Sequence, residues 1–142
     1  MKKSLLAAAL TIVVAAFTST GYAAYTTIPL EGLLSFPDAK GNVEISYPDI
    51  GLNVNEVTVD VSGLKPNAVY TVWLTREAPS RLKGLGVGDY AFRTDAAGNG
   101  RFVASVPDGE MLRWDVIEIA HHPNGDPADL DNAQVALRGD LG

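Results

Sequence analysis

Cysteine is absent from all 142 residues of the sequence, and histidine occurs only twice, as the adjacent pair His121 and His122. Without cysteine the chain has no disulfide, no thiolate ligand for a metal ion, no thiol nucleophile and no cysteine to which a lipid could be attached. Its stability must therefore come from side-chain packing and backbone hydrogen bonding. Any imidazole chemistry is confined to one place in the chain.

Long apolar runs are scarce, because only residues 5–17 form one, with a single threonine as interruption. This run holds roughly 13 residues, fewer than the roughly 20 that a membrane-spanning helix needs. Lys2 and Lys3 precede it, and the small residues Gly21 and Ala23 follow at the −3 and −1 positions of a cleavage site. The arrangement is typical of a secretory signal peptide.

The predicted signal peptide spans residues 1–23, with cleavage after Ala23 or Ala24, and leaves residues 24–142 as one domain. A chain of that length can bury a sufficient core without covalent cross-links. Because no second apolar run follows, we expect a soluble protein without a membrane span. The expected location is the periplasm or the outside of the cell.

Basic residues are few in the exported segment. Lys2 and Lys3 belong to the signal peptide, so nine of the 11 basic residues remain beside all 17 acidic residues, and the formal charge is −8. Nucleic acids and anionic lipid surfaces favour basic proteins, so this charge argues against both as partners. It is compatible with cation binding, and equally with an exported protein that must stay dispersed in water.

Helical periodicity is absent after the signal peptide, whereas strand patterns run almost throughout. Residues 56–62 alternate polar and apolar side chains, so Val57, Val59 and Val61 should share the core face. About eight such segments, separated by turn signals, predict an all-β fold: a single-domain antiparallel β-sandwich of Ig-like or Greek-key type without a substantial helix. The expected strands are residues 27–35, 42–47, 56–62, 68–75, 89–94, 101–106, 113–120 and 133–138.

Two connecting segments, residues 48–54 and 76–88, are longer than hairpin loops. The second is expected to cross between the two sheets of the sandwich. Trp73 and Trp114 fall within predicted strands. We expect both tryptophans to be core or half-buried residues rather than a platform for stacking sugars.

The stretch VSGLKPNAVYTVWL, followed by DYAFRTDAAGNGRFVASVP, combines a Gly-Leu-x-Pro turn, a Tyr-x-x-Trp-Leu strand and a Phe-x-x-Asp-x-x-Gly hairpin. These motifs resemble the outer domain of anti-sigma-K-type regulators, which is an extracytoplasmic β-sandwich. A fainter resemblance to chordin-type and copper-zinc superoxide dismutase sandwiches rests on the Ser-Gly-Leu-x-Pro turn at residues 62–66. Together the resemblances cover about residues 57–138 and imply a fold.

The resemblances do not imply an activity, because the chain departs from both patterns. An anti-sigma regulator carries a cytoplasmic sigma-binding segment and a membrane span, and neither is seen here. The dismutase uses several histidines as copper and zinc ligands, whereas this chain has two. We therefore expect neither of these activities.

The stretch IEIAHHPNGDPADLDN, residues 117–132, is the foremost candidate site. Imidazole is a common ligand of copper and zinc. Clustered carboxylates on a loop suit calcium or another hard cation, although the spacing of the aspartates does not match an EF-hand. The predicted metal ligands are His121, His122, Asp126, Asp129 and Asp131.

Strand geometry sets a condition on this metal site. Successive side chains point to opposite faces, so His121 should share the core face with Ile117 and Ile119, while His122 faces water. The two rings could converge only if the strand ends near Ala120 and turns. The alternative interpretation is a polar turn at a strand end, since aspartate and asparagine favour turns through their own hydrogen bonds.

A second candidate lies in the segment 76–88, where Arg76, Arg81 and Lys83 form a basic cluster on an acidic protein. Loops carried on a rigid scaffold often bind partners. The cluster predicts contact with a protein partner or a small anionic ligand, and the alternative is a solvated loop. Its glycines match no phosphate-binding motif, because no helix follows them.

Catalytic motifs are lacking. No serine lies in a Gly-x-Ser-x-Gly context, and nothing singles out a pair of carboxylates. The sequence therefore favours a non-catalytic binding or accessory module over an enzyme. Two alternatives remain open: a small metal-binding protein that uses the 121–132 loop, and a structural subunit that self-associates through open sheet edges. No cofactor other than a divalent metal ion is expected, and the oligomeric state is left undetermined.

Overall fold

A computed structural model describes residues 24–47 and 53–142. The predicted signal peptide, residues 1–23, lies outside the described residues, and so do residues 48–52 of the predicted loop 48–54. The regular secondary structure of the described part is almost entirely strand, and its only helical segment is the single-turn 3-10 helix η3, Met111–Arg113. The prediction of an all-β protein is confirmed.

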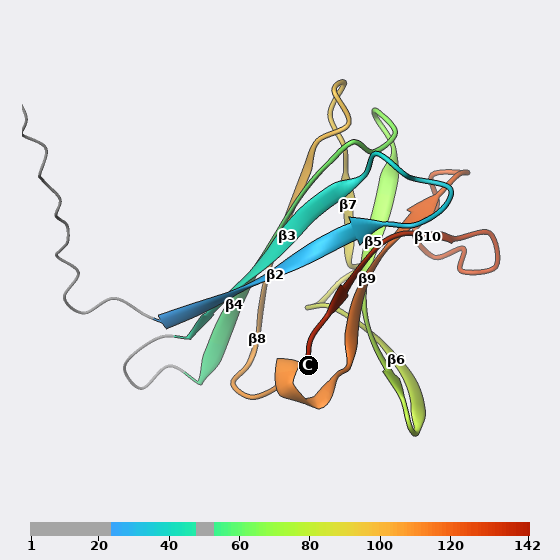
Figure 1. Ribbon diagram of the computed structural model, residues 1–142. Coiled ribbons are helices and arrows are strands. Elements are labelled where there is room, and N and C mark those ends of the chain that lie inside the picture. The colour runs from blue at the N-terminus through green and yellow to red at the C-terminus, as the bar shows by residue number, and fades with distance from the viewer. Residues whose placement is uncertain (1–23, 48–52) are drawn as a thin grey trace, which may run out of the picture.

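Within the described residues nine antiparallel strands form one sheet (Figure 1). Eight strands follow the order β6-β5-β9-β10-β2-β3-β4-β8, and β7 also pairs with β5. The strands are β2 (Ala24–Gly32), β3 (Lys40–Tyr47), β4 (Val54–Ser62), β5 (Val69–Glu77), β6 (Ser80–Gly84), β7 (Ala91–Arg93), β8 (Gly100–Pro107), β9 (Val116–His122) and β10 (Gln134–Asp140).

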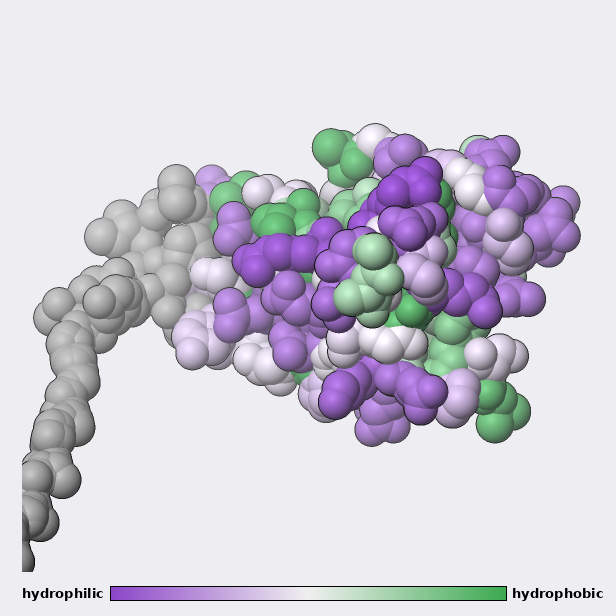
Figure 2. Space-filling view, turned by 90° about the horizontal axis from the view of Figure 1, so that it is seen from above, coloured by the Kyte–Doolittle hydropathy of each residue, from purple (hydrophilic) through white to green (hydrophobic). Residues whose placement is uncertain are grey.

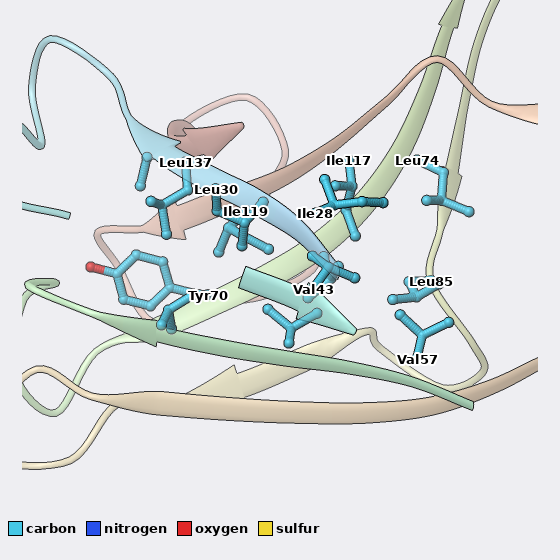
Figure 3. Close-up of a cluster of buried hydrophobic side chains, with 14 of the residues drawn as sticks. Ile28, Leu30, Val43, Val57, Tyr70, Leu74, Leu85, Ile117, Ile119 and Leu137 are labelled. Carbon is cyan, nitrogen blue, oxygen red and sulfur yellow. The ribbon is translucent and has the colours of Figure 1, made fainter. Parts of the chain in front are cut away.

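The sheet curls around its buried side chains. Strand alternation places Val57 and Val59 on the inner face, as predicted, and both are fully buried. Figure 3 shows Val57 and Val43 of one half of the sheet opposite Ile117 and Ile119 of the other half. These side chains belong to one apolar cluster, so the whole curled sheet shares a single core.

The two-sheet sandwich and the Ig-like topology are not confirmed, because the strands form one curled sheet, a half-barrel. The join that makes the sheet continuous is short: β10 pairs with β2 only at Leu137↔Gly32 and Arg138↔Glu31. Continuing that register would bring Asp140 opposite Pro29, which has no backbone N–H to donate. A pairing of only two residues leaves no distinct pattern in the sequence. The sequence therefore predicted two separate sheets where the structure has one.

The predicted crossover at residues 76–88 is wrong. Strand β5 continues to Glu77, turns at Ala78–Pro79 and returns as β6, so this segment begins as a β-hairpin. Four of the five β6 residues are exposed. The outer part of the hairpin extends beyond the core, so residues 76–83 lack the apolar alternation by which a strand is recognised.

The loop from Leu85 to Tyr90 lies between β5 and β8, because it bonds to Val72 of β5 and its Gly86 approaches Ala104 of β8. Leu85 is fully buried and donates its backbone N–H to Val72, while Val72 donates to the carbonyl of Tyr90. The Tyr90 ring lies directly on Gly84, where a Cβ atom would be 2.1 Å from the ring. Glycine is required at this position because the aromatic ring and the backbone are in contact.

The surface of the described residues is mixed in character. Figure 2 shows apolar residues in separated groups among polar ones on one face of the molecule. Leu34, Val87 and Leu112 are the most exposed large apolar residues, and they lie in three different connecting segments. Among the described residues there is no helix of the length and apolar character needed to cross a membrane.

Candidate functional site

The two histidines lie on opposite faces of the sheet and do not converge. Strand β9 continues through His122 rather than ending at Ala120. His121 therefore points inward with Ile117 and Ile119, as predicted. The prediction that His122 faces water is wrong, because its side chain is only 1% exposed. The 123–133 loop folds back over the outer face of the sheet and covers the ring.

A buried chain of hydrogen bonds holds His122 in place. The Trp73 indole N–H donates to Thr71 Oγ1 at 2.7 Å, and Thr71 Oγ1 lies 2.7 Å from His122 Nε2. On the other side of the ring, His122 Nδ1 is 3.2 Å from the backbone carbonyl of Asp129. A carbonyl only accepts, so the neutral ring carries its proton on Nδ1 and accepts the Thr71 hydroxyl proton at Nε2.

The pairing of Thr71 with His122 has the spacing of a hydroxyl nucleophile and its base, with the backbone carbonyl of Asp129, and not its carboxylate, as the orienting group. Thr71, however, is 0% exposed, and His122 is almost as deeply buried. Because a substrate cannot reach the hydroxyl in this conformation, the network is structural. It fastens the 123–133 loop to the outer face of β5 and β9.

The 123–133 loop is also held by its own side chains. Asp129 accepts hydrogen bonds from the side-chain amides of Asn124 and Asn132, and its other oxygen accepts the Asn132 backbone N–H at 3.3 Å. Asp126 caps the backbone N–H of Ala128 at 2.9 Å. The hydrogen bond from Asn132, followed by that from Asn124, lowers the pKa of the Asp129 carboxyl below its ordinary value.

The five predicted metal ligands are not gathered in the structure. Asp129 is occupied by two amides, His122 is buried beneath the loop, and His121 is on the other side of the sheet. Asp126 and Asp131 are exposed. Within the residues that the structure describes, no three His, Asp or Glu side chains are arranged to hold a metal ion.

His121 occupies an aromatic environment at one end of the half-barrel. Its ring centroid lies 5.0 Å from that of Tyr70 and 5.6 Å from that of Phe36. Burial lowers the pKa of His121 below 6.5, and the Lys65 ammonium and the neighbouring His122 lower it further, while a hydrogen bond with Gln134 opposes the shift.

The three side chains of the basic cluster lie on one face of the β5–β6 hairpin, and two of them already have partners within the chain. Arg76 pairs across the hairpin with Arg81. Its guanidinium donates to the carbonyl of Arg113 and lies 5.6 Å from the Trp114 ring centroid. Lys83 forms an ion pair with Glu110 at 3.1 Å. Two of the three predicted partner-binding residues thus support neighbouring segments, and Arg81 is the one whose side chain forms neither a hydrogen bond nor an ion pair with another described residue.

The two predicted surfaces lie at opposite ends of the molecule (Figure 1). In the β5–β9 ladder Val69 is opposite His122, whereas Thr75, next to Arg76, is opposite Val116. Six residues of strand separate them, which is about 20 Å at the usual rise. The 123–133 loop and the β5–β6 hairpin tip therefore cannot bind one small ligand together.

A hollow of about 530 Å³ lies beside the short β2–β10 join and has no signal in the sequence. Its lining includes Glu31, Glu77, Asp115 and Asp140, with Arg138 as the basic residue. Arg138 and Glu77 approach to 3.9 Å and are largely solvated, so their ion pair is weak. These carboxylates come from four separate segments, and only the folding of the sheet brings them together.

The fold and these sites describe a small antiparallel half-barrel that carries a braced polar loop on its outer face. No protein-family model matches the chain, and no curated protein is significantly similar to it.

Proposed function

We propose that the protein is an exported, non-catalytic binding module whose working surface is the 123–133 loop. The observation that carries the proposal is the bracing of this loop. Its carboxylate and amide side chains hold one another, and the buried His122 anchors its backbone to the sheet. A loop ordered before it meets a partner loses less conformational entropy on binding, so pre-organisation favours recognition.

The exposed side chains of the loop support a polar partner surface. Asn124, Asp126 and Asp131 are exposed, and Pro123 is exposed beside them. Asp131 takes part in no side-chain hydrogen bond of the described residues, so its carboxylate is available to a donor. We infer that the partner is a protein that presents hydrogen-bond donors.

Export to the periplasm or the cell exterior is part of the same proposal and rests on the pattern of residues 1–23. Strand β2 begins at Ala24, which pairs with Tyr47 of β3. Cleavage after Ala23 would therefore leave the described sheet whole. The Ig-like sandwich and the resemblance to the outer domain of anti-sigma-K-type regulators rest on sequence motifs alone and remain proposals.

A photocrosslinking experiment in the exporting cell tests the binding surface. A photoreactive amino acid replaces Ala128, which is exposed in the loop, or Ala78, which is exposed at the opposite end of the sheet. We expect a discrete crosslinked product from position 128 and none from position 78. The product should disappear when Asp129→Ala releases the two asparagine amides. Equal crosslinking from both positions, or none from position 128, would contradict the proposal.

The metal-binding alternative predicts a different result from thermal unfolding of the exported chain. A ligand at a hundredfold excess over Kd stabilises the native state by about 2.7 kcal/mol, which raises the midpoint by several degrees in a domain of this size. Because the candidate ligands are dispersed, we expect the chelated protein and the protein with calcium, zinc or copper to unfold within about 1 °C of each other. A rise of several degrees that Asp129→Ala abolishes would favour the metal-binding protein instead.

A further inference from the structure

His121 joins two loops at one end of the half-barrel. Phe36 comes from the loop 33–39 and packs edge-on against the His121 ring. Lys65 comes from the turn after β4; its ammonium lies 5.5 Å from the Phe36 ring centroid, and its backbone N–H donates to the Tyr70 hydroxyl at 3.0 Å. The imidazole therefore sits where the sheet and both loops meet.

The His121 ring is placed for its neutral form. It is 6% exposed, and its Nδ1 atom is buried with no hydrogen-bond partner among the described residues. A second proton would put a positive charge into this aromatic environment, and burying an unpaired charge is costly.

No group of opposite charge among the described residues pairs with the His121 ring. Lys65 and His122 oppose protonation, and Tyr70 is a neutral phenol held by the Lys65 backbone. The hydrogen bond with Gln134 on β10 favours the protonated ring, but Gln134 is uncharged and burial outweighs its effect. Asp38, the acid on the loop that carries Phe36, is exposed. Among the described residues no carboxylate forms an ion pair with His121.

The loop 33–39 is the segment that can detach while the sheet stays folded. The backbone N–H groups of Phe36 and Ala39 donate to carbonyls of the loop itself. Among the described residues one backbone hydrogen bond joins the loop to another strand, from the N–H of Leu33 to the carbonyl of Ala136. The neighbouring strands β3 and β4 are instead joined along seven residue pairs. Loss of the contact between Phe36 and His121 would therefore free the loop before the sheet.

We propose that His121 is an acid-sensitive latch: when it takes up a proton, its contact with Phe36 breaks, and the loop 33–39 leaves the end of the half-barrel while the sheet persists. Release uncovers the Phe36 and Tyr70 rings. In an exported protein, this device makes apolar surface available in acidic surroundings and hides it at neutral pH.

The direction of the pH effect follows from the lowered pKa of His121. The open state binds a proton near the ordinary value of 6.5, and the closed state binds one only at lower pH. The closed state is therefore fully favoured above pH 6.5 and loses stability as the pH falls from 6.5 toward the lowered value. In that interval one proton changes the opening equilibrium by up to about tenfold per pH unit.

Amide hydrogen exchange with the full exported chain tests the latch. We expect the protection factors of Leu33 and Phe36 to fall by up to about tenfold per pH unit below 6.5, while those of Val43 and Val59 in the ladder stay constant. In His121→Phe, which keeps an aromatic ring and cannot titrate, the loop protection should be independent of pH. Equal acid sensitivity in wild type and variant would overturn the proposal.

A second measurement serves if His121→Phe does not fold. The chain has two histidines only, so the imidazole resonances of the wild type can be assigned and titrated by NMR. The latch requires that the loop amides change over the same pH interval in which His121 titrates. Loop amides that remain protected after His121 has become charged would overturn the proposal as well.

Discussion

Replacing Thr71 by valine should lower the free energy of unfolding by about 3 kcal/mol, because it removes the hydroxyl at the centre of the Trp73–Thr71–His122 network while keeping the shape of the side chain. The substitution leaves His122 Nε2 buried without a donor and Trp73 without its acceptor. An unsatisfied buried polar group costs about 1–3 kcal/mol. Denaturant unfolding of residues 24–142 measures the effect.

Two matched variants isolate the role of the hydroxyl. Thr71→Ser keeps it and should cost about 1 kcal/mol, the price of a buried methyl group. Thr75→Val makes the same exchange on the same face of β5, at a half-buried position outside the network, and should change stability by less than about 0.5 kcal/mol. If Thr71→Val proves no more costly than Thr75→Val, then the network does not fasten the loop.

Replacing Gly63 by alanine should be at least as damaging, with an expected loss of about 3–5 kcal/mol. Gly63 has a φ of +72°, which disfavours any residue with a Cβ atom by about 1–3 kcal/mol. In addition, the Cβ atom would lie 2.1 Å from the backbone carbonyl oxygen of Asp38. A backbone atom cannot be moved as a flexible side chain can, so the loop 33–39 must shift.

Gly88→Ala is the control for the cost of placing alanine at a positive φ. Gly88 has a φ of +84°, and a Cβ atom there would meet nothing within 4 Å. The difference between the two alanine variants, about 2 kcal/mol or more, measures the close approach of the Gly63 turn to Asp38. Similar thermal midpoints for both variants would show that the two loops are not in contact at this end of the half-barrel.

Much of the strand pattern could be predicted because it depends on neighbours in the chain. Alternation predicted the inward direction of Val57, Val59 and Val61, and the structure confirms it. The same rule predicted His121 on the core face with Ile117 and Ile119. Strand β6 was missed because it carries no buried stripe, since the hairpin extends beyond the core.

The candidate site was predicted less well, because burial at its positions is decided by distant segments. Alternation assigned His122 to the outer face correctly, but whether that face meets water depends on the 123–133 loop that folds over it. No signal marked Thr71 as the partner of His122, since the two residues are 51 positions apart. The metal hypothesis arose from proximity in sequence, whereas the sheet holds the two histidines on opposite faces.

The sequence by itself determined an all-β chain, the places of most strands and the residues that face the core, because side-chain alternation along a strand is a local property. Only the tertiary structure decided that the strands form a single curled half-barrel. That outcome depends on two residue pairs between Leu137 and Arg138 of β10 and Gly32 and Glu31 of β2. The tertiary structure also buried His122 and brought His121, Phe36 and Lys65 together, because long-range packing decides which polar groups are removed from water.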